Sequence, residues 1–419
     1  MRDFLPAEVR AREEVLATVR GVFESYGFAP LQTPAAERLE ILWGRYGEEG
    51  DQLIFKIAQR GAKAGEEPDL ALRYDLTVPL ARVVAEYPGR VGRIFKRYQI
   101  APVWRADRPA RGRFREFYQC DVDVVGAGTG LADTEVVLVL TDALAAVGLK
   151  GSEVRVNSRR VLRGLIQSFG IDPSREAEVL TALDKLDKIG AEAVAEELAT
   201  RGLAAADLLE ALTGPADDLR ARLAASDDGR EGLAEVDRLT ELVAPLVQEA
   251  TVCFSPALAR GLGYYTGPIF EVYVEGSASA IASGGRYDGL IGLFAGRDVP
   301  AVGGSLGIER IIPLVEAAEQ RESPATVLVA VWDEGSRPDA LATASELRAA
   351  GIPTEVYLGD DRVGEQLGYA ASRGIPLAVL RGPREREQGL VTVRDLRTRA
   401  QTSVAEAELA GYIKQRGAT

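Results

Sequence analysis

Histidine is absent from all 419 residues of this chain, and its absence excludes several kinds of chemistry. Serine–histidine triads, histidine-bound zinc and phosphohistidine transfer all need an imidazole group from the protein. Any general base must therefore be a carboxylate, a tyrosine, a lysine or the substrate itself.

Cysteine is nearly as scarce, because the chain has only Cys120 and Cys253, far apart in sequence. Two such residues predict neither a disulfide framework nor a metal cluster, and we expect no metal ligands from the chain. No apolar run approaches the length of a membrane span, and the first residues, MRDFLPAEVR, lack the apolar core of a signal peptide. These features predict a cytoplasmic protein without a membrane-spanning segment.

The chain also has no excess of positive charge, since 63 acidic residues outnumber 50 basic ones and leave a net charge of −13. This balance argues against a chain-wide nucleic-acid surface but not against a local one. Residues 90–115 reverse it, because Asp107 is the only acid among many arginines and lysines. The length and the 46% hydrophobic content predict two or three globular domains.

Residues 95–126 are predicted to form a hairpin on which the rest of the chain is organised. Two strand-forming runs flank the polar loop ADRPARG. In the second run, side chains alternate between an apolar face and a polar one. The apolar face has Tyr118, Cys120, Val122 and Val124, and the polar face has Phe117, Gln119, Asp121 and Asp123.

The loop of this hairpin is rich in arginine rather than lysine. Antiparallel sheets often have one solvated face, so a wet hairpin without a ligand is one interpretation. Arginine, however, is the side chain best suited to a planar, two-pronged contact with phosphate. We therefore favour a polyphosphate site on this sheet face, with arginines at positions 105, 108, 111, 113 and 115 as its candidates.

The segment LRYDLTVPLAR at 72–82 leads from a strand into a helix. Asp75 or Thr77 is placed to cap that helix. Alternatively, Asp75 lies at the rim of a pocket and holds a substrate ammonium group. The sequence leaves both interpretations open.

Glycine gathers in two later segments, which we expect to be close-approach turns beside a ligand. Residues 283–289 are predicted to be a turn, and residues 302–310 precede a helix expected at Ile311–Ala318. An arginine accompanies each glycine cluster of this part of the chain, at Arg260, Arg286 and Arg310.

The pattern of helix- and strand-forming residues in the rest of the sequence divides the chain into two domains. Residues 161–247 are almost wholly helical in character and suggest a helical insertion in a domain spanning 1–322. After a linker at 319–325, strands and helices alternate, which predicts a small α/β domain at 326–419.

Taken together, these segments resemble histidyl-tRNA synthetases, a family of class II aminoacyl-tRNA synthetases, over nearly the whole chain. The matching segments are RDFLP at 2–6, LRYDLTVPLAR at 72–82, the hairpin at 95–126, ALDKLDKIG at 182–190, ARGLGYYTGPIFEV at 259–272, SGGRYDGL at 283–290, GGSLGIER at 303–310 and EVYLGD at 355–360.

The resemblance implies an α+β fold, with an antiparallel sheet flanked by helices, a helical insertion and a C-terminal anticodon-binding domain. It implies a homodimer that uses ATP with Mg²⁺ to form histidyl-adenylate from L-histidine, and then transfers the histidyl group to the 3′ end of tRNA(His).

The family also implies roles for individual residues. The adenylate-forming arginines are Arg105 and Arg260. ATP is held by Arg105, Asp107, Arg113, Phe117 and Arg310. The amino acid is held by Asp75, Thr77, Gln119, Asp123, Tyr264 and Tyr265, with Asp123 and Tyr265 on the imidazole.

The chain departs from the family pattern at two positions. Gly263 stands where the family has Asp, and Ala110 stands where many relatives have Gln in the loop that approaches the tRNA end. The first departure motivates two alternatives: a histidine-sensing subunit resembling the regulatory partner of ATP phosphoribosyltransferase, and an adenylating paralogue with a non-tRNA acceptor. A histidine-free synthetase could still be translated when histidine is scarce, although engineering would leave the same composition.

Overall fold

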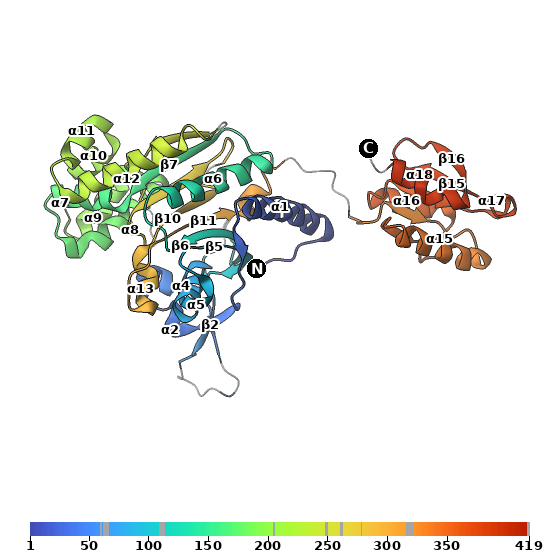
Figure 1. Ribbon diagram of the computed structural model, residues 1–419, viewed down its shortest axis with the longest axis horizontal. Coiled ribbons are helices and arrows are strands. Elements are labelled where there is room, and N and C mark those ends of the chain that lie inside the picture. Colours follow the sequence, from blue (N-terminus) through green and yellow to red (C-terminus); the bar gives the residue numbers. More distant parts are fainter. Residues whose placement is uncertain are drawn as a thin grey trace. The chain divides into compact units, whose positions relative to one another are not determined.

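The computed structural model describes residues 1–58, 61, 67–108, 114–203, 206–247, 250–259, 263–277, 279–315 and 322–416. The chain divides into two compact units (Figure 1). The first comprises Met1–Arg2 and Glu14–Glu316, and the second comprises Asp3–Glu13 and Ala317–Thr419. No helix of the described residues is both long and apolar enough to cross a membrane.

The first unit is built on an eight-stranded sheet with the order β1-β5-β6-β11-β10-β9-β7-β8. Only its outermost pairs, β1–β5 and β7–β8, are parallel, and the other pairs are antiparallel. Its strands are β1 (Ala29–Pro30), β5 (Phe95–Trp104), β6 (Glu116–Val125), β7 (Ser152–Ser158), β8 (Ala250–Phe254), β9 (Pro268–Tyr273), β10 (Ala282–Arg286) and β11 (Ala301–Gly307). The predicted α+β fold with an antiparallel-rich sheet is confirmed.

One face of this sheet is covered by helices and forms the main core. The second half of α1 (Pro6–Ser25) and α6 (Leu131–Ala146) place Phe23 and Leu140 in this core. From β6 the alternating residues Cys120, Val122 and Val124 point into it, as the sequence pattern predicts. The polar residues of the same strand are therefore turned to the opposite face.

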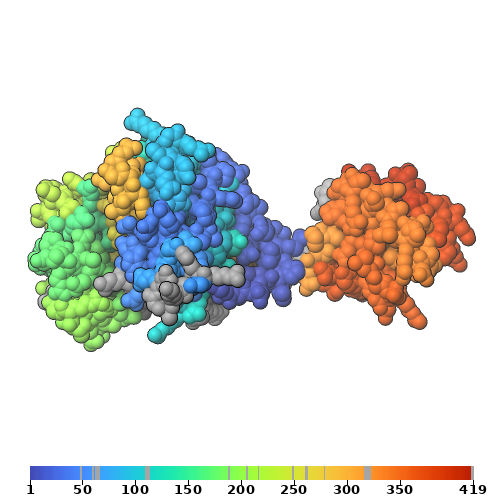
Figure 2. All heavy atoms as spheres, turned by 90° about the horizontal axis from the view of Figure 1, so that it is seen from below, coloured from blue at the N-terminus to red at the C-terminus, as the bar shows by residue number. Residues whose placement is uncertain are grey.

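The opposite face is walled by a second apolar cluster. It contains α2 (Leu39–Leu42), α4 (Thr77–Glu86) and α13 (Asp288–Ala295), together with a small sheet of β2 (Ala36–Arg38), β4 (Leu70–Leu72) and β3 (Lys56–Ile57). The short helices α3 (Gly47–Asp51) and α5 (Pro88–Val91) lie in the same region of the chain. Figure 2 shows α13, in orange, beside the blue segment that contains α4 and α5.

A helical segment is inserted between β7 and β8. Its helices are α7 (Arg159–Ser168), α8 (Glu176–Leu183), α9 (Leu186–Thr200), α10 (Ala206–Thr213), α11 (Ala216–Leu223) and α12 (Asp227–Val243), with a 3-10 turn at Pro173–Arg175. Helix α12 packs along α7 and against β7, so the segment is joined to the main core rather than held apart from it.

The glycine-rich segment at 283–289 is not a turn, so this prediction is wrong. Residues 282–286 form β10, a central strand paired with both β9 and β11. The glycines serve packing: a Cβ on Gly284 would lie 2.6 Å from the ring of Phe270, and a Cβ on Gly304 would lie 2.6 Å from a methyl of Leu140. Close approach is needed, as expected, but on the core face the approaching groups belong to the protein itself: the backbone of β11 at Gly284, and the side chains of Phe270 and Leu140.

The helix expected at Ile311–Ala318 is also misplaced. Helix α14 begins at Ile308 and ends at Ile311, directly after β11. The apolar residues that follow, Ile312, Leu314 and Val315, pack against the main core without forming a helix of their own. Apolar spacing alone did not show that the strand leads straight into a single helical turn.

Arg286 is a structural residue rather than a ligand-binding arginine. Its guanidinium is 1% exposed and donates to both carboxylate oxygens of Asp133 on α6, at 2.9 and 2.8 Å, and to Asp288 at 2.9 Å. It thus ties α6 and the start of α13 to β10. The neighbouring glycines had suggested that Arg286 lies beside a ligand, but they place it in a buried ion pair instead.

The second unit has a five-stranded sheet with the order β13-β12-β14-β15-β16. Strands β12 (Val327–Val329), β13 (Thr354–Val356) and β14 (Leu377–Leu380) are parallel, whereas β15 (Leu390–Asp395) and β16 (Gln401–Ala405) are antiparallel additions. Its helices are α15 (Arg337–Ala349), α16 (Val363–Ser372), α17 (Pro383–Gln388) and α18 (Leu409–Arg416), with 3-10 turns at Glu334–Ser336 and Glu406–Glu408. The sequence pattern did not predict β16 or α17.

Candidate functional site

A cavity of about 350 Å³ opens on the polar face of the eight-stranded sheet of the first unit. The polar side of β6 forms its floor, because Phe117, Gln119, Asp121 and Asp123 all line it. From Phe117 to Asp123 the strand advances about 20 Å, which is long enough to hold two different chemical groups end to end. An arginine and an aromatic ring lie at one end of the floor, and acids lie at the other.

Arg105 lies at the hairpin end, just after the last residue of β5. Its guanidinium carbon is 4.3 Å from the ring centroid of Tyr74 and 5.1 Å from that of Phe117. Its Nε donates to the carbonyl of Tyr74 at 3.1 Å. The two rings and this hydrogen bond fix the plane of the guanidinium and leave its remaining N–H groups available for an anion in the cavity.

Two other predicted residues, Arg310 and Asp107, line this end together with Glu309, which was not predicted. Arg310, on α14, donates from Nη1 to the carbonyl of Ala280 at 2.6 Å, which holds its side chain along the cavity wall. The neighbouring Glu309 accepts a hydrogen bond from the backbone N–H of Tyr118 at 3.0 Å. Asp107 is buried and also lines the cavity.

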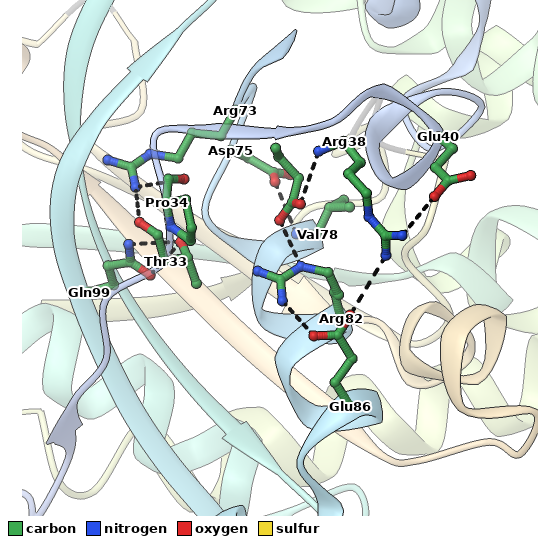
Figure 3. Close-up of polar contacts among 11 residues, drawn as sticks. Thr33, Pro34, Arg38, Glu40, Arg73, Asp75, Val78, Arg82, Glu86 and Gln99 are labelled. Atoms are coloured by element: carbon green, nitrogen blue, oxygen red, sulfur yellow. Dashed lines mark hydrogen bonds and ion pairs between the residues drawn. The ribbon is translucent and has the colours of Figure 1, made fainter. Parts of the chain in front are cut away.

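Asp75 caps the start of a helix and also lines the cavity, while its contact with a substrate ammonium group stays a prediction. Its Oδ1 accepts from the backbone N–H of Val78 at 3.0 Å (Figure 3). The same oxygen accepts from the hydroxyl of Tyr46 at 3.2 Å. Its Oδ2 accepts from the hydroxyl of Tyr264 at 3.4 Å. Burial raises the pKa of Asp75, although the Val78 N–H and Arg105 oppose the rise. Thr77, the first residue of α4, lies beside it in the cavity wall.

The segment before α4 is held in place by Arg73. Its Nη1 donates to the carbonyl of Thr33 at 2.7 Å (Figure 3). Its Nε donates to the carbonyl of Pro102 at 2.9 Å. The Thr33 hydroxyl in turn accepts from Gln99 on β5 at 3.1 Å. These bonds fix the start of α4, and with it Asp75, against β5.

Asp123 lies at the acidic end and is held on both sides. Arg97, directly opposite on β5, approaches its Oδ2 with Nη2 at 2.7 Å, and both side chains are buried. The hydroxyl of Tyr287 donates to its Oδ1. Burial raises the pKa of Asp123, and Arg97 opposes the rise. Each carboxylate oxygen can accept a second hydrogen bond, so the group remains able to bind a ligand.

Gln119 lies between these two ends. Its amide nitrogen donates to the hydroxyl of Ser305 on β11 at 3.4 Å. Its buried Oε1 has no hydrogen-bond partner among the residues that the structure describes. A buried acceptor without a partner, facing a cavity, is suited to a donor on a ligand.

Tyr264 and Tyr265 form the wall above the floor, with their ring centroids 5.1 Å apart and their ring planes inclined at 63° to each other. A Cβ on Gly285 would lie 2.9 Å from the ring of Tyr265, so the lack of a side chain at Gly285 leaves room for this ring. On the same face, a Cβ on Gly303 would lie 1.9 Å from Oδ1 of Asp123. Gly285 on β10 and Gly303 on β11 therefore make room for Tyr265 and Asp123, two residues that line the cavity.

The structure thus brings ten of the predicted site residues into one cavity: Asp75, Thr77, Arg105, Asp107, Phe117, Gln119, Asp123, Tyr264, Tyr265 and Arg310. The other two, Arg113 and Arg260, lie outside the described residues, as does Ala110. Gly263 is described, and a Cβ there would meet no described atom within 4 Å.

Sequence reasoning did not assign a role to several residues that line the cavity: Asp121, Tyr287, Ser305 and Glu309. It also missed Tyr46 and Arg97, which hold Asp75 and Asp123 in place. For Asp121 the signal was present, because it shares the polar face of β6 with Gln119 and Asp123. Arg97 had no such signal, since its position opposite Asp123 depends on the register of the hairpin.

Comparison with known proteins agrees with this geometry. The profile of the family described as "Histidyl-tRNA synthetase" matches residues 1–311, and that of "Anticodon binding domain" matches residues 311–416. A histidine–tRNA ligase of Gloeobacter violaceus is 41% identical, with 96% of this chain and 95% of the relative covered. One from Cytophaga hutchinsonii is 41% identical, with 94% of each covered. The solved histidyl-tRNA synthetase of a Nostoc species has a TM-score of 0.81 at 32% identity, with 99% of this chain and 97% of that one covered.

Proposed function

The chain belongs to the histidyl-tRNA synthetase family of class II aminoacyl-tRNA synthetases, and from this premise we propose what its residues do. It is a histidine–tRNA ligase: it joins histidine to ATP as histidyl-adenylate, releases pyrophosphate, and passes the histidyl group to tRNA. Full-length relatives with this activity do not favour the histidine-sensing subunit or the paralogue with another acceptor.

ATP lies at the hairpin end of the cavity in this proposal. Arg105 contacts the α-phosphate and the attacking carboxylate, and Phe117 stacks under the adenine while Asp107 faces its amino group. Arg310 contacts the outer phosphates and the adenine face. Arg113 and Arg260, outside the described residues, are assigned to the outer phosphates and the α-phosphate by their motif positions alone. The single observation that carries the proposal is Arg105, fixed between two rings in the same cavity as Asp75 and Asp123.

Histidine lies over the rest of the floor. Asp75, Thr77 and Gln119 hold its amino and carboxyl groups, with Tyr264 supporting Asp75 through their hydrogen bond. Asp123 and Tyr265 contact the imidazole ring. A side chain without ring N–H groups would leave buried polar groups unpaired, and sites of this kind discriminate by about 10⁴–10⁵-fold.

The reaction needs no base from the protein. The carboxylate of histidine is the nucleophile, and it carries no proton at neutral pH. Negative charge increases on the phosphate oxygens during attack, and fixed guanidinium groups lower the energy of that arrangement. A chain without histidine can therefore perform the adenylate-forming step.

We propose that Mg²⁺ enters with ATP. Among the described residues no cluster of three or more acidic or cysteine side chains could hold a metal by itself. This donor set fits an ion that is bound mainly by phosphates, because Mg²⁺ in nucleotide sites commonly uses only one or two carboxylates. Glu309 is the cavity carboxylate suited to share it. When bound, the ion would neutralise phosphate charge.

We also propose that the protein acts as a homodimer in the cytoplasm. The second unit would contact the anticodon of tRNA(His), in keeping with its match to the anticodon-binding family. The first unit, with its helical segment, would bind the 3′ end of the tRNA, which receives the histidyl group. We assign the catalytic domain to residues 1–322 and the tRNA-binding domain to residues 326–419.

The proposal is tested by ATP–pyrophosphate exchange with each of the twenty amino acids, followed by charging of tRNA(His). We expect exchange with histidine alone, and charging of tRNA(His) but not of another tRNA. Exchange without dependence on histidine would contradict the assignment of substrate. ATP–pyrophosphate exchange without charging of tRNA(His) would instead support the alternative of an adenylating paralogue with a different acceptor.

Gly303→Ala should weaken histidine binding more than ATP binding. The new methyl group would overlap Oδ1 of Asp123 and lie 2.9 Å from the carbonyl of Val122, so the carboxylate must move. We expect the histidine KM to rise roughly tenfold to 100-fold, the effect of an overpacking cost of about 1–3 kcal/mol. Gly263→Ala is the matched control, because its methyl group meets no described neighbour. Equal KM values in the two variants would show that Asp123 is not held by this contact.

A further inference from the structure

The acidic end of the cavity contains more negative than positive charge. Asp121 and Asp123 lie two residues apart on the same face of β6, and Arg97, opposite Asp123 on β5, is the cation that opposes the rise in pKa of both. All three side chains are at most 3% exposed. Arg97 pairs with Asp123 at 2.7 Å and also donates to the carbonyl of Leu76 at 3.0 Å, so its position is fixed. One carboxylate is therefore left without a full counter-charge in a site shielded from water.

Asp121 is that carboxylate. It lies between Gln99 on β5 and Ser305 on β11, and it lines the cavity. Its Oδ1 is buried and has no hydrogen-bond partner among the described residues. An uncompensated carboxylate oxygen facing a ligand cavity is costly unless a donor or a proton reaches it.

Charged and titratable groups from every neighbouring element act on Asp121. Arg97 belongs to β5, Asp123 to the same strand, and Arg73 and Asp75 to the segment before α4, while Tyr287 precedes α13 and Cys120 lies on the far face of β6. Burial raises the pKa of Asp121 to about 7; Arg97 and Ser305 oppose the rise, while Asp123 and Asp75 add to it. Near neutral pH the group therefore exchanges a proton easily.

We propose that the cavity binds the substrate imidazole as the imidazolium cation, with Asp121 as its counter-charge. This inference rests on the proposed function, because it needs histidine as the substrate. Imidazolium has two N–H donors and one positive charge, which matches a floor with two acids and one guanidinium. A neutral ring would leave Asp121 either charged without a partner or protonated.

The proton balance is simple. When a neutral ring meets protonated Asp121, the O–H bond of the acid breaks, an N–H bond forms on the ring, and no proton enters or leaves. The complex holds one proton on the pair. Before binding, the ring and Asp121 together hold no titrating proton above about pH 7. Below about pH 6.5, the ordinary pKa of imidazole, they hold two. Binding should therefore be strongest near pH 6.5–7 and weaken by about tenfold per pH unit well outside that range.

The test is the Kd of histidine, measured by calorimetry on the full chain from about pH 5.5 to about pH 8.5. It is combined with ¹⁵N NMR of ring-labelled histidine in the complex, for which the chain, having no histidine, gives no imidazole background. We expect a bell-shaped profile and two nearly equal ring-nitrogen shifts, the pattern of the cation. Affinity that is constant above about pH 7, with widely separated shifts, would overturn the inference and leave the proposed function intact. No histidine binding at any pH would overturn both.

Asp121→Asn identifies the counter-charge. This variant leaves one acid and one guanidinium at the acidic end, so the imidazole ring should bind in its neutral form. The Kd of histidine should then stop rising above pH 7, and the ¹⁵N shifts of the two ring nitrogens should separate. Asp142→Asn is the matched control, since this exposed residue on α6 bonds to Tyr26 and does not line the cavity. It should behave like the unchanged chain. An imidazolium signal that persists in Asp121→Asn would show that Asp121 is not the counter-charge, and the inference would fail.

Discussion

Arg105→Ala should lower the rate of histidine-dependent ATP–pyrophosphate exchange by about 10³-fold, as expected when a fixed cation is removed from a phosphoryl-transfer site. In the structure this guanidinium is held by the rings of Tyr74 and Phe117 and by the carbonyl of Tyr74. It is therefore positioned before substrate arrives, and its loss leaves the developing charge without its nearest fixed partner among the described residues. The fold should survive, because this side chain lines a cavity rather than the core.

Two further variants make this result specific. Arg105→Lys keeps the charge but loses the planar, two-pronged contact, so it should recover only part of the rate. Arg222→Ala removes an arginine that lies 4.3 Å from the ring of Phe169, outside the cavity, and should leave exchange unchanged. Near-normal exchange in Arg105→Ala, with unfolding unaltered, would show that the phosphate site lies elsewhere.

Asp123→Asn should raise the histidine KM by about 100-fold while the ATP KM changes by no more than about twofold, because a charged hydrogen bond in a buried site is lost. The ATP KM should change little because Asp123 lies at the acidic end of β6, six residues from Phe117, which we propose to stack under the adenine. The same change leaves Arg97 buried without its partner, so the free energy of unfolding should fall by about 3 kcal/mol, measured by denaturant titration.

The double variant Arg97→Met, Asp123→Leu separates binding from stability. Replacing a buried ion pair by apolar side chains of similar size is often neutral or stabilising, so unfolding should return towards the original value. Histidine binding should stay lost. If histidine binding returned together with stability, or if both KM values rose equally in Asp123→Asn, the assignment of Asp123 to the imidazole would be wrong.

The sequence by itself determined which side of β6 faces the substrate. Alternation with a period of two places Gln119 and Asp123 on one face and Cys120 and Val122 on the other, whatever the strand pairs with. The α+β architecture and the family followed from local patterns and motif segments of the same kind. Such features depend on residues close together in the chain, and these are the features that a sequence shows directly.

Only the tertiary structure decided which arginines line the cavity and which hold the fold. Arg286 and Arg310 both follow glycine segments, yet one pairs with Asp133, 153 residues away, and the other lines the cavity. Likewise, Asp75 both caps α4 and lines the cavity, and Asp121 lacks a directly paired cation because the register places Arg97 opposite Asp123. Contacts between distant segments depend on strand order and register, which local periodicity leaves open, and the charge balance of a buried site is the sum of such contacts.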